Sequence, residues 1–137
     1  MPLVGTAVCQ PIVALDFDGV IHSYTSGWRG SAIIPDKPVK GVERAIALLR
    51  SMGYKIIIYS TRCATPQGRK TMKAYLKRWN IKVDGIATEK PGCFCYVDDR
   101  AITFSGDWDK TINDITTFRS YIEYNKEKIN GKGNSGS

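Results

Sequence analysis

The chain has 137 residues, of which 42% are hydrophobic and 24% charged, proportions typical of one globular domain with its own core. Twenty Lys and Arg stand against 13 Asp and Glu, and the net charge of +7 favours an anionic partner such as a nucleotide or a nucleic acid. No apolar run is long enough to cross a membrane and no cationic segment precedes the first apolar stretch, so we expect no membrane partner, no signal peptide and a cytoplasmic location.

The four cysteines are Cys9, Cys63, Cys93 and Cys95, and the chain has a single histidine, His22. A lone C-x-C pair with one histidine matches none of the usual zinc spacings. We therefore expect the cysteines to be unpaired thiols in a reducing compartment.

The first half of the chain predicts one strand, one loop and one helix. Residues 1–10 are a lead-in, and the apolar run 12–15 predicts a central strand buried on both faces. Segment 22–38 is rich in Ser, Thr, Gly, Trp and Pro, which indicates a long ordered loop or a small hairpin. Apolar residues at helical spacing then predict a helix over 39–52, with Gly53 at the position where it would end.

The second half continues the alternation of strands and helices. Residues 54–59 predict a second strand, and 66–79 predict a helix with one apolar stripe. Two short strands are expected over 81–86 and 93–97. Alternating strands and helices are typical of βαβ units, so we expect an α/β fold: a three-layer, Rossmann-like, mostly parallel sheet with helices on both faces.

The C-terminal part predicts a last helix over 107–129, with Asp107 or Asp109 as its N-terminal cap. Residues 131–137 contain little that can pack, and we expect a disordered tail. The whole of 1–130 is thus interpreted as a single domain.

Two carboxylates, Asp16 and Asp18, end the first predicted strand and are followed by Gly19. Burying carboxylates at a strand end is costly unless a cation or a reaction requires them. The point at which strands leave an open α/β sheet is also where such folds bind ligands. The pattern therefore indicates a site at this edge of the sheet.

Polar residues follow two other predicted strands in the same way. Ser60-Thr61-Arg62 follows the second strand and Asp98-Asp99-Arg100 follows the last one, while Lys90 lies shortly before that last strand. In a parallel sheet these ends lie along one edge, so acids, a hydroxyl and an ammonium group can meet around a small volume.

These motifs, in this order, resemble the haloacid dehalogenase (HAD) superfamily, and within it the phosphatases. The residues that carry the resemblance are Asp16-Phe17-Asp18-Gly19, Ser60, Lys90 and Asp98-Asp99. The resemblance implies an Mg²⁺-dependent phosphatase that hydrolyses a phosphomonoester through an aspartyl-phosphate intermediate.

The same resemblance implies a role for each matching residue. Asp16 would be the nucleophile and Asp18 the general acid and base. Ser60, or Thr61 if the motif is matched one residue later, would bind a phosphoryl oxygen. Lys90 would balance the charge on the nucleophile and on the transferring group. The expected Mg²⁺ ligands are Asp16, the backbone carbonyl of Asp18 and Asp98, with Asp99 beside them.

Neither interval between the motifs is long enough for a cap domain, so we expect an open site. In this family an open site goes with a large substrate or with a partner subunit that supplies the lid. A homo-oligomer is therefore one of the alternatives. Candidate substrate-binding residues are Thr61 and Arg62, which follow Ser60, and Trp28 and Arg29 in the 22–37 segment, where His22, Tyr24 and Lys37 lie as well.

Positive charge and loop aromatics favour a phosphorylated substrate that is a nucleotide or a nucleic-acid end. Two alternatives remain open from the sequence. One is a non-catalytic HAD-like module that binds nucleic acid or protein; the other is a phosphotransferase, in which an acceptor other than water takes the phosphoryl group.

Overall fold

The structure is a computed structural model that describes residues 11–126. The predicted lead-in, Cys9, the end of the predicted last helix and the predicted tail lie outside the described residues. The chain forms two compact units, Met1–Asp98 and Asp99–Ser137, which are described separately. The assignment of 1–130 to a single domain stays a prediction. Among the described residues, none of the helices has the length and apolar character that crossing a membrane requires.

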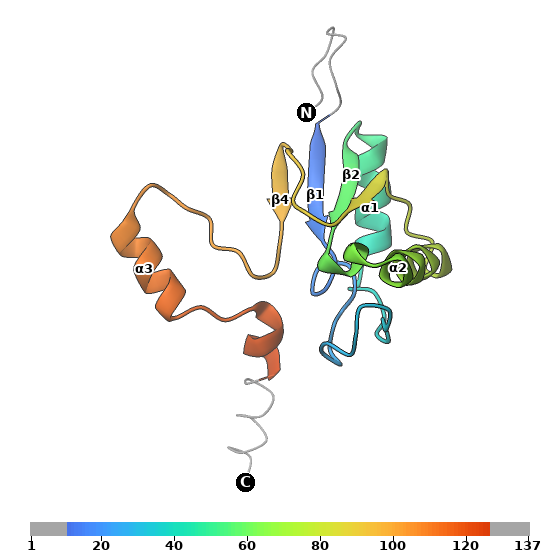
Figure 1. The fold of residues 1–137 in the computed structure, drawn as a ribbon. Helices are drawn as coiled ribbons and strands as arrows, with labels where there is room; N and C mark the ends of the chain where they lie inside the picture. The colour runs from blue at the N-terminus through green and yellow to red at the C-terminus, as the bar shows by residue number, and fades with distance from the viewer. Residues whose placement is uncertain (1–10, 127–137) are drawn as a thin grey trace, which may run out of the picture. The chain divides into compact units, whose positions relative to one another are not determined.

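The first unit is built on one four-stranded, all-parallel sheet with the strand order β3-β2-β1-β4 (Figure 1). Its strands are β1 (Ile12–Asp16), β2 (Lys55–Tyr59), β3 (Gly85–Ala87) and β4 (Cys95–Val97). The parallel sheet with its connecting helices confirms the predicted α/β, Rossmann-like fold class.

The register of the sheet brings the carboxyl ends of the strands together. Asp16 at the end of β1 pairs with Tyr59 at the end of β2, and Tyr59 pairs with Ala87 at the end of β3. On the other side of β1, Leu15 pairs with Val97, the last residue of β4. The residues that follow these strands therefore emerge along one edge, as the sequence predicts.

Helices connect the neighbouring strands of the first unit. Helix α1 (Val42–Ser51) lies between β1 and β2, and η1 (Thr61–Ala64) with α2 (Pro66–Arg78) lies between β2 and β3. The predicted apolar stripe of α2 is confirmed, since its three inward residues are buried and Trp79 packs against the same core. The core joins strand and helix residues: Val13, Leu15, Phe17, Ile21, Ile46, Ile56, Ile58, Cys63, Met72, Tyr75, Leu76 and Ile81.

The strand predicted over 81–86 is shorter than expected. Only Gly85–Ala87 forms a strand, while Ile81 donates its N–H to Leu76 and closes the end of α2. Ile81 is nevertheless buried, because it packs into the core from the connection and not from the sheet. An apolar run of this length looks the same in either setting.

In the second unit, α3 (Trp108–Thr116) starts as predicted, with the Asp107 carboxylate accepting the N–H of Lys110 at 3.1 Å. The prediction of one continuous helix over 107–129 is wrong, because the helix ends at Thr116 and the described chain is not helical again until residue 121. The restart has a local cause: the Ser120 hydroxyl caps the helix by accepting the N–H of Glu123, and it also donates to the Glu123 carboxylate.

Candidate active site

Three carboxylates gather at the carboxyl edge of the sheet. One carboxylate oxygen from each of Asp16, Asp98 and Asp99 lies within 4.8 Å of the others. Asp16 ends β1, and Asp98 directly follows β4, the neighbour of β1 in the sheet, so the parallel register brings them together. The sequence analysis expects Asp16 and Asp98 as metal ligands with Asp99 beside them, and we call the three carboxylates the acidic cluster.

The chemistry of the acidic cluster fits Mg²⁺. Mg²⁺ takes oxygen ligands, with one or two protein carboxylates and waters completing the shell. Oδ1 of Asp99 is buried and has no hydrogen-bond partner among the described residues, an arrangement that is costly for a carboxylate unless a cation compensates it.

A tyrosine and a lysine surround Asp98. The Tyr59 hydroxyl donates to Oδ2 of Asp98 at 2.7 Å, and Nζ of Lys90 lies 3.9 Å from the same oxygen. The Lys90 ammonium also lies over two aromatic rings, 5.5 Å from the centroid of Tyr59 and 5.1 Å from that of Tyr96. The structure thus brings Lys90 to the acidic cluster, beside Asp98.

Tyr59 is a member of the site that the sequence analysis missed. Burial, followed by its bond to Asp98 and the nearby negative charge, raises the pKa of its hydroxyl well above the ordinary value. Tyr59 therefore remains a proton donor that orients Asp98. The one signal in the sequence was a hydroxyl-bearing side chain at the end of a strand, immediately before Ser60.

Asp18 lies beyond the strand and has other partners than Asp16. Strand β1 ends at Asp16, and the chain turns at Gly19, whose φ of 88° is a left-handed conformation. The Asp18 carboxylate accepts hydrogen bonds from Nε of Arg62, at 2.9 Å, and from Nδ1 of His22, at 2.9 Å. Burial acts to raise the pKa of Asp18, but the bonds from His22 and Arg62 outweigh it and lower the pKa.

Arg62 is fully buried and anchors both Asp18 and the 22–37 segment. Its Nε and Nη2 donate to Asp18, while Nη1 lies 2.8 to 3.1 Å from the carbonyl oxygens of three loop residues, Gly30, Ser31 and Ile33. The predicted loop is therefore ordered by an arginine from the η1 turn. The sequence analysis proposed that Arg62 binds a substrate anion, whereas in the structure its N–H groups point to these internal acceptors.

His22 is a further residue whose environment differs from the prediction. The sequence analysis placed it among loop residues able to touch a substrate, but its side chain is completely buried. Nε2 accepts the backbone N–H of Asp36 at 3.1 Å, so the proton of the neutral ring lies on Nδ1, which faces Asp18. His22 thus ties the start of the loop to its end and holds Asp18 in place.

The other predicted site residues follow β2 or lie in the 22–37 segment. Ser60 follows β2, is buried, and its Oγ accepts the N–H of Arg62 at 3.2 Å, whereas Thr61 is exposed. Trp28 is 54% exposed and its ring lies 4.6 Å from the Arg62 guanidinium. Arg29 is exposed beside it. The loop therefore presents an aromatic face and a cation to solvent.

The arrangement combines two sets of groups with different chemistry. The acidic cluster with Lys90 and Tyr59 can hold a divalent cation and a phosphate. The second set, Asp18 with Arg62 and His22, keeps a carboxylate in its anionic form.

Comparison with known proteins adds a distant similarity to a solved structure. No protein-family model matches the chain, and no curated protein matches it. Among solved structures, the chain is similar to a chain of the Pnkp1/Rnl/Hen1 RNA repair complex, with 17% sequence identity and a TM-score of 0.45. The similarity covers 80% of this chain and 33% of that chain, so this chain spans about a third of its length.

Proposed function

We propose that this protein is an Mg²⁺-dependent phosphatase of the HAD type, which hydrolyses a phosphomonoester through an aspartyl-phosphate on Asp16. The observation that supports the proposal best is the acidic cluster, because its three carboxylates converge at the strand ends that the sequence motifs mark. Bound Mg²⁺ would neutralise phosphate charge there. Asp16, Asp98, Asp99 and the backbone carbonyl of Asp18 are the residues proposed to hold it.

The proposed reaction has two displacement steps at phosphorus. In the first, a carboxylate oxygen of Asp16 bonds to phosphorus, and the bond from phosphorus to the alcohol oxygen breaks, so that the alcohol leaves with a proton. In the second, water attacks phosphorus, the bond to Asp16 breaks, and inorganic phosphate is released. The N–H of Phe17 donates to Oδ1 of Asp16 at 2.8 Å and orients the nucleophile. Lys90 and Ser60 are proposed to stabilise the phosphoryl oxygens.

Asp18 is proposed to handle the protons of both steps. Its anionic form, which Arg62 and His22 stabilise, is the form that accepts a proton from the attacking water. Protonating a poor leaving group in the first step requires the form that these contacts disfavour. Substrates with good leaving groups should therefore depend least on Asp18.

The proposed substrate is a nucleotide or the phosphorylated end of a nucleic acid. The half-exposed Trp28, stacked on Arg62, offers a flat aromatic surface on which a base can stack, and Arg29 adds a cation beside it. The chain's net charge of +7 favours the same anionic class.

The test measures phosphate release from para-nitrophenyl phosphate, nucleoside monophosphates and DNA and RNA with phosphorylated ends, in Mg²⁺ and in chelator. We expect metal-dependent release by the wild-type chain and loss of at least about a thousandfold in Asp16→Asn, since the nucleophile and a metal ligand are removed together. Asp109→Asn, which removes an exposed carboxylate in α3, is the matched control and should keep the wild-type rate. Unchanged turnover in Asp16→Asn would contradict the covalent mechanism. Absence of release from every substrate would instead favour the non-catalytic module.

A further inference from the structure

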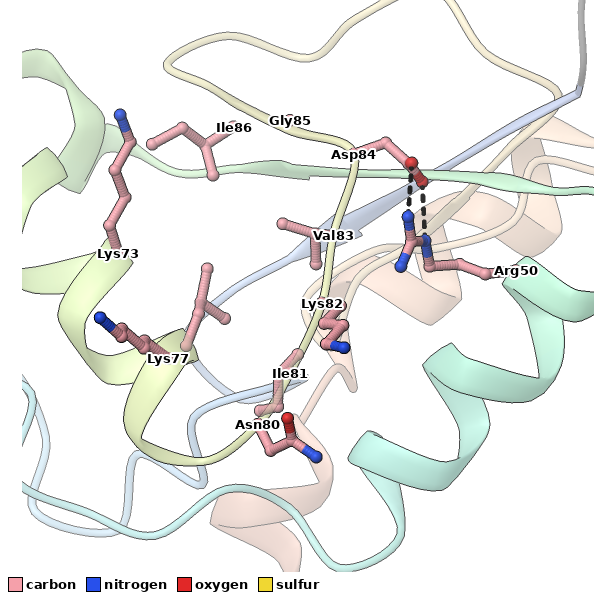
Figure 2. A pocket seen from close by; sticks show the side chains of 11 residues that line it. Arg50, Lys73, Lys77, Asn80, Ile81, Lys82, Val83, Asp84, Gly85 and Ile86 are labelled. Atoms are coloured by element: carbon pink, nitrogen blue, oxygen red, sulfur yellow. Dashed lines mark hydrogen bonds and ion pairs between the residues drawn. The ribbon is translucent and has the colours of Figure 1, made fainter.

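A pocket lies on the first unit, away from the residues of the acidic cluster. It has a volume of about 580 Å³ and lies beside α2 and the connection that leads into the start of β3 (Figure 2). The residues that line it combine basic and apolar side chains: Arg50, Lys73, Leu76, Lys77, Asn80, Ile81, Lys82, Val83, Asp84, Gly85 and Ile86. We call it the basic pocket. The proposed phosphatase chemistry uses none of these residues.

The single acid of the basic pocket is already compensated inside the protein. Arg50 donates to both oxygens of Asp84, at 3.3 and 3.0 Å, and the backbone N–H of Ile56 donates to Asp84 at 2.8 Å. Burial acts to raise the pKa of Asp84, but the bonds from Ile56 and Arg50 outweigh it and lower the pKa. Asp84 is therefore an anion whose charge is matched by Arg50.

Three lysines of the basic pocket remain without such compensation. Lys73 and Lys77 are exposed residues of α2, four positions apart and hence on one face of the helix, and Figure 2 shows both on the same side of the pocket. Lys82 is exposed on the connection. Within the part of the chain that the structure describes, none of the three forms an ion pair. The pocket thus has an excess of positive charge available to a ligand.

The apolar side of the pocket narrows the chemistry of that ligand. Val83 and Ile86 are half-buried and line the pocket with the buried Leu76 and Ile81 behind them, so part of its wall is apolar. The volume lies within the range of about 300 to 1,000 Å³ that is usual for small-ligand sites. Lysine ammonium groups suit phosphates as point charges, whereas carboxylates are best matched by the fork of an arginine, and here the one lining arginine is engaged with Asp84.

We infer that the basic pocket binds single-stranded nucleic acid. Lys73, Lys77 and Lys82 contact backbone phosphates, and a base or sugar lies against the apolar surface. The inference goes beyond the proposed phosphatase and is tested by binding alone, so either proposal can fail while the other stands.

The experiment compares two double variants that each remove two positive charges. Lys73→Gln/Lys77→Gln alters the basic pocket, and Lys40→Gln/Arg44→Gln alters two exposed cations near the start of α1 that lie outside it. Glutamine is a good helix former, so α2 should persist, which circular dichroism checks. Binding of a short labelled single-stranded RNA, and of DNA of the same sequence, is followed by fluorescence anisotropy over a range of salt concentrations.

We expect the pocket variant to bind about tenfold more weakly and the slope of log K against log salt to fall by about 1.4, which is two phosphate contacts at about 0.7 each. The α1 variant should change neither quantity by a comparable amount. Equal losses in both variants would reduce the effect to overall charge and overturn the inference. A wild-type chain that binds neither nucleic acid, or that binds an acidic peptide of equal charge as tightly, would overturn it too.

Discussion

Arg62 holds together two parts of the first unit that are far apart in sequence. Its buried guanidinium donates to Asp18 and to three loop carbonyls, so each of its nitrogens has an acceptor. Lysine would retain the charge but would offer fewer donors from a single point. Arg62→Lys should therefore leave buried acceptors without partners and lower the free energy of unfolding by about 3 kcal/mol, measured by urea denaturation.

Arg69→Lys is the matched control for this change. Arg69 is exposed and donates to a single carbonyl oxygen, that of Cys63, at 2.7 Å. Its replacement should cost less than about 1 kcal/mol. Losses of equal size in the two variants would show that the contacts of Arg62 with Asp18 and the loop contribute little to stability.

Asp18 should make the free energy of unfolding depend on pH in the acidic range. Its pKa in the folded state lies below the ordinary value of 3.8, because the bonds from His22 and Arg62 outweigh the effect of burial. Between the folded and the ordinary pKa the unfolded chain binds more protons, so the stabilisation is fully present above the ordinary value and is lost as the pH falls through the folded pKa. The stability difference between wild type and Asp18→Asn should shrink from pH about 7 to pH about 3 in urea titrations. A difference that stayed constant over this range would contradict the lowered pKa.

At the scale of elements, the strands were predictable because their sequence signals are local. The runs that form β1 and β2 are β-rich and mostly buried, and the polar residues that follow β1, β2 and β4 mark one edge of a parallel sheet. This reasoning brought Asp16, Asp98 and Asp99 to one edge, since parallel register decides which strand ends meet, and the family resemblance then implied their place at a metal.

Other elements depended on contacts that no local pattern contains. The connection 81–84 has a strand-like sequence, yet Ile81 packs into the core from the end of α2, and Asp84 pairs with Arg50 of α1. The partnership of Arg62 with His22 and Asp18 also escaped prediction, because it exists only once the loop has folded over the η1 turn. The helix start at Ser120 had a signal in the sequence, Ser followed by Glu three residues later, which the prediction of one helix over 107–129 did not use.

Close packing between elements also constrains the site. Gly68, in the first turn of α2, approaches η1 so closely that a Cβ built on it would lie 1.9 Å from the carbonyl oxygen of Arg62. Only glycine allows this approach, which places the start of α2 against the backbone of the residue that holds Asp18. The geometry of Asp18 therefore depends on helix packing as well as on its own hydrogen bonds.

The net charge of the whole molecule is +7, but its negative and positive side chains are concentrated at different sites. The acidic cluster concentrates negative charge where β1 and β4 end, and the basic pocket concentrates positive charge beside α2 and the start of β3. A cation bound at the acidic cluster would offset its negative charge, and a polyanion bound at the basic pocket would offset its positive charge.

The acidic cluster should make thermal stability depend on magnesium. A cation that binds only the folded chain stabilises it by mass action, by about 2.7 kcal/mol at a concentration about a hundred times Kd. In chelator, the three neighbouring carboxylates repel one another, so Asp16→Asn should unfold at the wild-type temperature or above it. In Mg²⁺ the order should reverse, because the variant lacks a ligand and gains little, while Asp109→Asn gains as much as wild type. Differential scanning calorimetry in both buffers measures these shifts. An equal gain in wild type and Asp16→Asn would place magnesium binding outside the acidic cluster.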